Sequence, residues 1–357
     1  MNTSVKTAQI TSNGKVHIID NMIQTSSDGD IVVKMRACGI CGSDLEKVFG
    51  SYGMSSSRLG HEPSGDIIFV GKNVSSNFKV GDRVFVHHHV SCNSCHYCRH
   101  GDFTMCSYYQ KSNLNPCGLS EKFIVPRWNV ERGGVLKIPD NLSFENAALI
   151  EPVACCIRAL NKINIDKGDD VAVFGAGPVG IMLVCLLKIY GAGHIFLIDI
   201  NDFRLNFAKK YIGNVQTINL TKYNYNNGIT EFKNIIKNNT NQLGVDLSIV
   251  ATSSLKAFNN SLEITRKGGK IMLFGVPPKN TIFSYDLSKI YSNELSILTS
   301  YAASEIETNQ ALKLFEEKRL DLDFLVTHKF DLVESNEAMY CAHQAKDCMK
   351  IIITNKN

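Results

Sequence analysis

The chain has 357 residues, 44% of them hydrophobic, which is enough to bury the cores of about two domains. Lys and Arg number 38 against 34 Asp and Glu, so the net charge of +4 is too mild to favour nucleic acid or an acidic membrane as a partner. No run approaches about 18 apolar residues and no secretion signal begins the chain, so its 12 cysteines predict reduced thiols or metal ligands in a cytoplasmic protein.

The first predicted elements are short strands. Residues 1–36 combine apolar stretches with polar turns, one of them at Ser12-Asn13-Gly14, and 31–35 reads as a strand. Two further strands are predicted at 66–70 and 81–86, with a glycine-containing turn between them. The first part of the chain is therefore predicted to be rich in β structure.

A possible metal site is spread over this region. The segment Cys41-Gly42-Ser43-Asp44 is followed, twenty residues past Cys41, by His61-Glu62, and Glu151 supplies another acid much later. Cys, His and Glu form a plausible zinc set with an open position for water or substrate. Cys38 is the rival to Cys41, and we interpret Cys38 as a small buried hydrophobic residue.

Three consecutive histidines, His87, His88 and His89, follow the strand predicted at 81–86. Side chains alternate between the two faces of a strand, so the three imidazoles cannot all ligate one ion. We expect a strand end here, with one histidine near a substrate cleft.

Four cysteines, Cys92, Cys95, Cys98 and Cys106, form the first strong motif. Four thiolates in one short loop can surround a tetrahedral zinc ion, and such a closed site leaves no room for substrate, so its role would be structural. The alternative is an iron–sulfur cluster, whose fourth cysteine would come three residues on, followed by proline. Here seven residues intervene and Ser107 follows, so we predict structural zinc.

Dinucleotide binding is predicted by the segment 170–199. A buried strand at 171–174 leads into Gly175-Ala176-Gly177-Pro178-Val179-Gly180, a helix to about Tyr190, and a second strand that ends on Asp199. Gly175 permits the tight turn, Gly177 lets the backbone approach a pyrophosphate, and Gly180 lets the helix pack closely on the strand. Asp199 lies 19 residues after Gly180. Its carboxylate would accept a hydrogen bond from a ribose 2′-OH and repel a 2′-phosphate, so we predict NAD rather than NADP.

The rest of the chain alternates between helices and strands. Before the glycine loop, a helix starting near 143–146 carries Glu151 to Leu160 and is predicted to bridge two domains. The other predicted helices are 204–211, 255–265, 305–317 and 336–345, with a polar surface helix and loops over 221–242. The predicted strands are 215–220, 245–251, 270–275, 294–300 and 349–354, with a turn at 266–269. The tail after residue 300 is expected to return to the first domain.

The order of these motifs resembles the zinc-dependent medium-chain dehydrogenase/reductases, which include alcohol, sorbitol and threonine dehydrogenases. The resemblance covers nearly the whole chain. It implies an α/β fold with a GroES-like catalytic domain at 1–154 that holds both zinc sites, a Rossmann NAD-binding domain at 155–299 with a doubly wound parallel sheet, and a return of 300–357 to the catalytic domain. It also implies a homo-oligomer, either a dimer or a tetramer.

The resemblance implies residue roles as well. Two zinc ions per chain are expected, and the catalytic ion would be held by Cys41, His61 and an acid, which is Glu62 or Glu151. Ser43 would take the hydroxyl proton of the substrate, and Asp44 would orient His61 as a hydrogen-bond acceptor.

Further roles concern the cofactor and the proton path. Lys350 is similar to a basic residue that in the family approaches Glu62 and the pyrophosphate, and Arg204 belongs to the expected cofactor site with Pro178 and Val179. Glu46 stands where many alcohol dehydrogenases have the histidine that ends the proton relay, so the relay would end at Glu46 or in water.

The substrate is predicted less sharply. Glu151 followed by proline is similar to polyol dehydrogenases, whereas Ser300 replaces the arginine that sorbitol dehydrogenases carry, and Cys117 departs from the usual glycine. We therefore predict a secondary alcohol of the polyol, sugar or cyclitol class. The alternatives are a threonine-type amino-alcohol dehydrogenase, an aldehyde or semialdehyde reductase and, from another class, a nucleic-acid-binding zinc module, which the mild charge disfavours.

Overall fold

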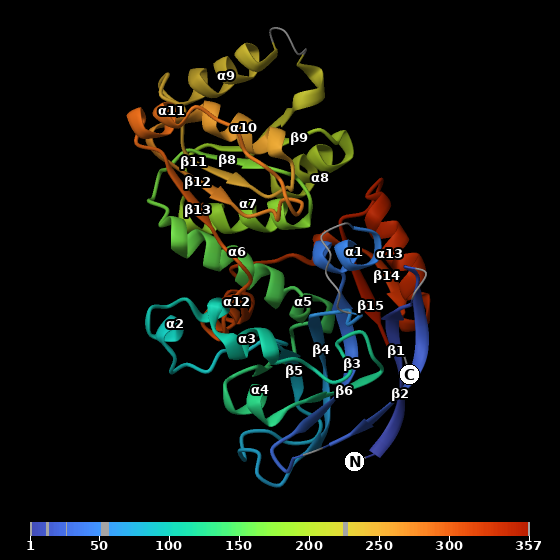
Figure 1. The fold of residues 1–357 in the computed structure, drawn as a ribbon. Coiled ribbons are helices and arrows are strands. Elements are labelled where there is room, and N and C mark those ends of the chain that lie inside the picture. The colour runs from blue at the N-terminus through green and yellow to red at the C-terminus, as the bar shows by residue number, and fades with distance from the viewer. Residues whose placement is uncertain (1, 12–13, 26, 51–56, 224–227, 356–357) are drawn as a thin grey trace. The chain divides into compact units, whose positions relative to one another are not determined.

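The computed structural model describes residues 2–11, 14–25, 27–50, 57–223 and 228–355 (Figure 1). Part of the predicted turn at Ser12-Asn13-Gly14 lies outside these residues, as does part of the predicted surface segment 221–242. The chain divides into two compact units: residues 1–154 together with 302–357 form the first unit, and residues 155–301 form the second.

The second unit is built on a six-stranded parallel sheet with the strand order β10-β9-β8-β11-β12-β13. This is the order expected of a Rossmann sheet, in which two halves wind outward from the central strand. The strands are β8 (Val171–Phe174), β9 (Ile195–Asp199), β10 (Gln216–Asn219), β11 (Val245–Val250), β12 (Thr265–Leu273) and β13 (Ser296–Thr299).

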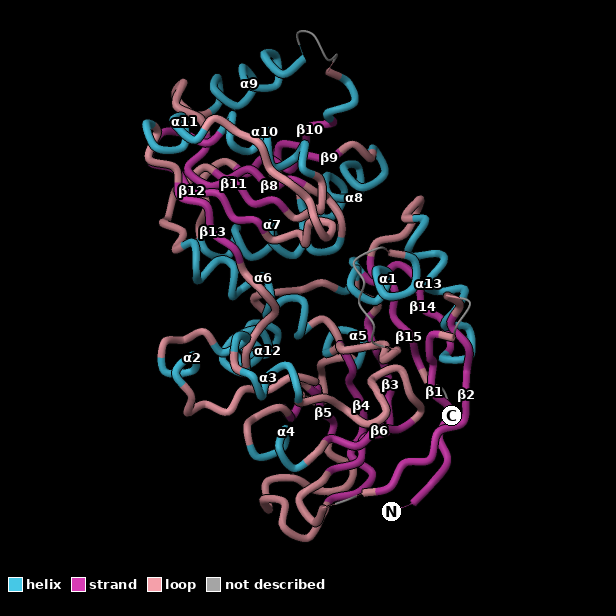
Figure 2. Tube along the Cα trace, viewed as in Figure 1, coloured by secondary structure: helices cyan, strands magenta, loops and turns pink. Residues whose placement is uncertain are grey.

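Helices cover both faces of this sheet, with α7 on one side and α9 and α10 on the other (Figure 2). All four residues of β8 are buried, as a parallel strand between two helical layers requires. The helices are α7 (Pro178–Tyr190), α8 (Asp202–Ile212), α9 (Gly228–Asn239), α10 (Leu255–Ile264) and α11 (Leu287–Ser292), with a 3-10 turn at Leu220–Lys222.

One local prediction in this unit is wrong. Residues 266–269 were expected to form a free turn, but β12 already begins at Thr265. The register against β11 shifts between the pairs Val245–Thr265 and Leu247–Lys270, so the extra residues form an irregular excursion inside the strand. Gly268, at φ +71°, supplies the backbone conformation that suggested a turn.

The first unit contains a larger, mainly antiparallel sheet with the order β14-β15-β3-β4-β5-β7, and β6 pairs with β3 outside this path. A separate hairpin is formed by β1 (Asn2–Ile10) and β2 (Val16–Gln24). The strands of the larger sheet are β3 (Ile31–Gly39), β4 (Glu62–Val70), β5 (Arg83–Val86), β6 (Lys122–Val125), β7 (Val135–Lys137), β14 (Val326–Asp331) and β15 (Lys350–Thr354).

The C-terminal strand β15 pairs antiparallel with β3, so the tail returns to the sheet of the first unit. The helices of this unit are α1 (Gly42–Phe49), α2 (His96–Arg99), α3 (Ser107–Lys111), α4 (Arg127–Glu131), α5 (Phe144–Ala147), α12 (Glu305–Glu316) and α13 (Ser335–Gln344). Short 3-10 turns lie at Phe103–Met105, Asp323–Leu325 and Leu332–Glu334, and the boundary between the units falls inside α6 (Ile150–Ile163).

Candidate active site

Three strands meet at one place in the first unit. Gly39, the last residue of β3, pairs with Glu62, the first residue of β4, and on its other side with Ile352 of β15. The chain continues from Gly39 to Cys41, which caps the N-terminus of α1. Strand register therefore brings segments from the start, the middle and the end of this unit to one point.

Cys41, His61 and Glu62 form a compact donor set at this point. One ligand atom from each lies within 4.8 Å of the others. A thiolate, an imidazole and a carboxylate at such distances match the donors of catalytic zinc, which keeps one position for water or substrate. The residues present therefore fit the metal that the sequence predicts.

Asp44 links the two loops that carry Cys41 and His61. Its fully buried carboxylate accepts from the amides of Cys41 and Gly60, at 3.2 Å each, and lies 3.5 Å from Nδ1 of His61. Burial alone would raise the pKa of Asp44, but His61 and Lys47 hold that pKa far below its usual value. A carboxylate that stays ionised can orient the imidazole of His61.

Glu62 has a second partner in Lys350. Nζ of Lys350 lies 2.8 Å from Oε1 and 2.5 Å from Oε2 of Glu62, and it also donates to the carbonyl of Ile40 at 3.0 Å. Burial raises the pKa of Glu62, and the charge of Lys350 offsets this only in part. Gly39 is required beside this pair, because a Cβ there would lie 1.7 Å from Oε2 of Glu62.

The second candidate acid, Glu151, lies nearby but outside the donor set. It is buried near the start of α6, and its charge helps to raise the pKa values of both Glu62 and Lys350. Among the described residues, the compact three-residue group includes Glu62 and not Glu151. Within the described residues, Glu62 therefore belongs to the donor set, and Glu151 is a buried acid whose charge acts on it.

The predicted proton-relay residues lie on α1. Ser43 is half-buried in the first turn of this helix. Glu46 lies one turn further on, and its carboxylate folds over the helix end, where a Cβ at Gly50 would meet Oε2 of Glu46 at 1.8 Å. No hydrogen bond joins Ser43 to Glu46 within the described chain, so a proton that leaves Ser43 needs water to reach Glu46.

The four-cysteine motif forms a second compact donor set, in which the sulfur atoms of Cys92, Cys95, Cys98 and Cys106 lie within 4.8 Å of one another. The amide and hydroxyl of Ser94 lower the pKa of Cys92 to about 6. Backbone amides also point at sulfur, from Cys95 to Cys92 at 3.3 Å and from Cys92 to Cys106 at 3.4 Å. Amide donors favour thiolates, which is the form that binds zinc.

The glycine loop of the second unit has the geometry that a dinucleotide needs. Gly175 lies at φ +104°, and a Cβ on Gly180 would lie only 1.8 Å from the carbonyl oxygen of Gly175. Gly177 caps α7 in an extended conformation, and Pro178 and Val179 follow as the first two helical residues. The amides at this helix end are oriented to receive a phosphate group.

Asp199 closes the same loop from the end of β9. Its carboxylate accepts from the amides of Ala176 at 2.5 Å, Ile200 at 2.6 Å and Asn201 at 2.9 Å. Arg204 approaches the loop as well, since its Nη1 lies 3.5 Å from the Cβ position of Gly177. The predicted cofactor residues of this unit are thus brought together, whereas Lys350 belongs to the first unit.

The histidine segment, His87 to His89, borders the Cys41–His61–Glu62 donor set. The sequence predicted one histidine near the substrate but not which one. The ring centroid of His88 lies 5.2 Å from that of His61 and 3.9 Å from that of His89. Nδ1 of His89 donates to the carbonyl of Ser112, and Nδ1 of His87 lies 3.6 Å from Oε1 of Glu305. His88 is therefore the histidine that neighbours the candidate metal site.

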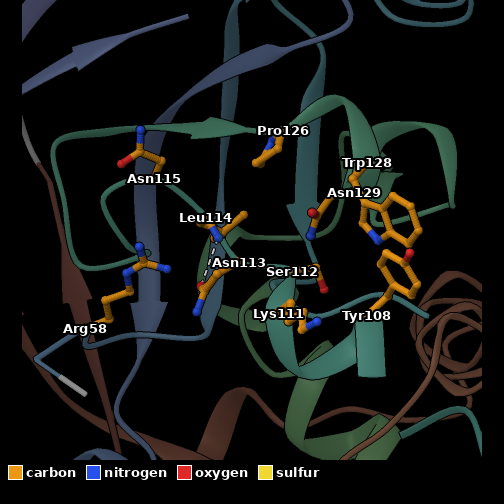
Figure 3. A pocket seen from close by; sticks show the side chains of 10 residues that line it. All are labelled: Arg58, Tyr108, Lys111, Ser112, Asn113, Leu114, Asn115, Pro126, Trp128 and Asn129. Atoms are coloured by element: carbon orange, nitrogen blue, oxygen red, sulfur yellow. Dashed lines mark hydrogen bonds between the residues drawn. The ribbon is translucent and has the colours of Figure 1, made fainter. Parts of the chain in front are cut away.

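A separate hollow of about 470 Å³ is lined by residues that include Ser112, Trp128 and Asn129 (Figure 3). Three residues of its wall hold the segment's backbone. Asn129 donates to the carbonyls of His87 at 3.2 Å and His88 at 2.9 Å, Trp128 donates to the carbonyl of Val90 at 3.3 Å, and the Ser112 hydroxyl accepts from the amide of Val90 at 2.8 Å. His88 is thus held on a fixed backbone.

Two features together define the class of protein. The second unit carries a dinucleotide-type loop on a Rossmann sheet. The first unit carries a Cys–His–Glu donor set and a four-thiolate donor set. This combination is that of a zinc-binding, dinucleotide-dependent dehydrogenase.

Comparisons with known proteins assign the family. The sequence pattern of the alcohol dehydrogenase GroES-like domain matches residues 27–140, and that of the zinc-binding dehydrogenase family matches residues 178–317. The sorbitol dehydrogenase of Bacillus subtilis (strain 168) is 34% identical over 331 residues, which span 91% of this chain and 90% of that protein. The L-threonine 3-dehydrogenase of Yersinia pestis (strain Pestoides F) is 30% identical over 324 residues, 89% and 90% of the two chains.

Solved structures agree with this assignment. An alcohol dehydrogenase from Thermus sp. ATN1 has a TM-score of 0.85 at 26% identity, covering 98% of this chain and 100% of that one. An alcohol dehydrogenase from Escherichia coli CFT073 in complex with NADH has a TM-score of 0.85 at 27% identity, covering 99% of each chain. The chain therefore belongs to the zinc-dependent medium-chain dehydrogenase/reductases.

The predictions of family, fold class and enzyme class are confirmed. The protein is a zinc- and NAD-dependent dehydrogenase that acts on a small-molecule alcohol. None of the helices in the described ranges combines the length and the apolar character needed to cross a membrane.

Proposed function

We propose that this dehydrogenase oxidises a secondary alcohol of the polyol, sugar or cyclitol class, with transfer of a hydride to NAD. The observation that carries the proposal is the clustering of Cys41, His61 and Glu62 within 4.8 Å, with Asp44 fixing both loops. The 34% identity to a sorbitol dehydrogenase supports the polyol class. Threonine is the second candidate substrate, because the threonine dehydrogenase relatives are 30% identical.

In this proposal Cys41 and His61 hold the catalytic zinc ion, with Glu62 or Glu151 as the third protein ligand, and the four-cysteine set holds a structural ion. Zinc supplies a Lewis acid that makes the alcohol more acidic, and NAD supplies the hydride acceptor. Ser43 accepts the hydroxyl proton and passes it to water or Glu46. Asp44 keeps the imidazole of His61 in one orientation through the 3.5 Å contact.

The cofactor lies, in this proposal, along the glycine loop of the second unit. Gly175, Gly177 and Gly180 allow the backbone to reach the pyrophosphate. Pro178 fixes the start of α7 and has no N–H of its own, and the amides of Val179 and the rest of the first turn act as donors. Asp199 binds the ribose hydroxyls, which favours NAD over NADP, and Arg204 contributes a positive charge at the loop. Lys350 holds Glu62 in the first unit.

We also propose a homodimer or homotetramer in the cytoplasm with no nucleic-acid partner. The family resemblance and the mild net charge of +4 support this proposal. Sedimentation of the purified protein tests the oligomeric state, and the same measurement with added DNA at low salt tests nucleic-acid binding.

The test combines zinc analysis with NAD reduction over sorbitol, myo-inositol, threonine and isopropanol. Cys41→Ala should lower the zinc content from two ions per chain to one and abolish activity while the fold is kept. Cys38→Ala is the matched control, because Cys38 is buried beside the site but outside the donor set, and it should keep both ions. Comparison of Glu62→Gln with Glu151→Gln identifies the acid that holds zinc.

One result would refute the catalytic half of the proposal. If wild type and Cys41→Ala both contain a single zinc ion, and neither oxidises any alcohol, only the four-cysteine site is real. Oxidation of threonine alone would instead assign the amino-alcohol function.

A further inference from the structure

The three consecutive histidines differ in what surrounds their rings. His87 is fully buried between Tyr109, at 6.2 Å between ring centroids, and the carboxylate of Glu305, and neither of its ring nitrogens has a hydrogen-bond partner among the described residues. His89 uses Nδ1 to donate to the carbonyl of Ser112. His88 alone neighbours His61, and its buried Nδ1 has no hydrogen-bond partner among the described residues.

An imidazole in this position is prepared to bind a polar group. Its backbone is held by Asn129, and its ring is confined between the rings of His61 and His89. Leaving a buried ring nitrogen without a hydrogen-bond partner is unfavourable, so a ligand that supplies the missing hydrogen bond is favoured over one that does not. The neighbouring residue, His61, is proposed to bind the catalytic zinc ion. The molecule that would bind next to it, and so reach His88, is the substrate.

We propose that His88 binds a second hydroxyl of the substrate, on the carbon next to the one that is oxidised, and so makes the enzyme prefer vicinal diols to simple secondary alcohols. This inference rests on the proposed function, in which the reacting oxygen lies at the site formed by Cys41 and His61. The hydroxyl on the adjacent carbon then lies close to His61, within reach of its neighbour His88. A hydroxyl can donate to or accept from an imidazole nitrogen, so either tautomer of His88 serves.

The experiment uses two substrates that differ only in that hydroxyl, propylene glycol and isopropanol. The ratio of their kcat/KM values is measured for wild type, His88→Leu and His88→Asn, together with zinc content. A misfolded fraction or a partial loss of zinc lowers both rates equally and leaves the ratio unchanged. His17→Leu, at an exposed position on β2, is the control substitution.

Wild type should prefer the diol. His88→Leu should lower the diol-to-alcohol ratio by about tenfold or more, since 1.4 kcal/mol corresponds to a factor of ten. His88→Asn keeps a donor and an acceptor and should retain most of the preference, whereas His17→Leu should match wild type. All four proteins should contain two zinc ions.

Three outcomes would overturn the inference and leave the proposed function standing. They are a wild-type enzyme that oxidises both substrates without preference, an unchanged ratio in His88→Leu, and the loss of one zinc ion in His88→Leu, which would make His88 a metal ligand. A zinc-loaded wild type that oxidises neither these two compounds nor sorbitol nor myo-inositol would refute the proposed function itself.

Discussion

The three glycines of the dinucleotide loop are predicted to fail in three different ways when each is changed to alanine. A Cβ on Gly180 would lie 1.8 Å from the carbonyl oxygen of Gly175, so α7 must move away from β8. A Cβ on Gly175 would face the carbonyl oxygen of Ala251 at 2.9 Å, at a φ of +104° that alanine rarely adopts. A Cβ on Gly177 would meet nothing nearer than Arg204, at 3.5 Å, which is ordinary contact.

The magnitudes follow from these contacts. Overpacking costs about 1–3 kcal/mol, so Gly180→Ala should lower the free energy of unfolding by at least that much. Gly175→Ala adds backbone strain of about 1–3 kcal/mol to its clash. Gly177→Ala exchanges one helix cap for a poorer one and should cost about 0.5 kcal/mol. The new methyl group of Gly177→Ala would nevertheless stand where the backbone approaches the pyrophosphate.

Thermal unfolding and NADH titration separate these effects. Gly180→Ala and Gly175→Ala should unfold at lower temperature, by ~2–4 °C for each kcal/mol lost. Gly177→Ala should unfold near the wild-type temperature but bind NADH at least tenfold more weakly, a loss of about 1.4 kcal/mol. The reasoning fails if Gly177→Ala binds NADH like wild type, or if Gly180→Ala is as stable as wild type.

Three further predictions concern other parts of the molecule. Cys98→Ser should remove one zinc ion per chain, measured by metal analysis, because it breaks the four-thiolate set; an unchanged zinc content would contradict that site. Tyr109→Phe should lower the free energy of urea unfolding by about 0.5–1.5 kcal/mol, since the tyrosine hydroxyl donates to the carbonyl of Ala303 at 2.7 Å; no change would mean that water replaces this bond. Asp199→Asn should raise the ratio of NADP to NAD kcat/KM by about tenfold or more, because a carboxylate repels the 2′-phosphate; an unaltered ratio would remove Asp199 from cofactor choice.

Much of the second unit could be predicted because its signals are local. An apolar strand, a glycine turn, a helix and a terminal acid follow one another within 170–199, and each reports on its neighbours in sequence. The exception is 266–269, where the paired glycines indicated a turn. β12 nevertheless includes them: its pairing with β11 breaks off after Thr265 and resumes at Lys270, where pairing with β13 also begins, which is a tertiary arrangement that the local sequence does not encode.

The first unit was harder to predict because its important contacts are distant in sequence. Strand β14 was missed because its residues are at best half-buried, so the apolar alternation that marks a strand is absent. Lys350 and Glu62 are 288 residues apart, and their pairing was predicted only from the family resemblance. Nothing in the run of histidines indicated which ring would neighbour His61, because Asn129 and Ser112 decide that from another segment.

Strand pairing explains why the candidate metal site depends so little on any single loop. Gly39 lies between Glu62 and Ile352 in the sheet, so the register of β3 with β4 and β15 fixes the spacing between Cys41, Glu62 and Lys350. Sheets resist changes of register because a one-residue slip turns every buried side chain outward. The candidate zinc ligands thus lie at the ends of strands whose register is set by the hydrophobic core. This rigid placement suits a site that must keep a metal ion and still leave one position open for substrate.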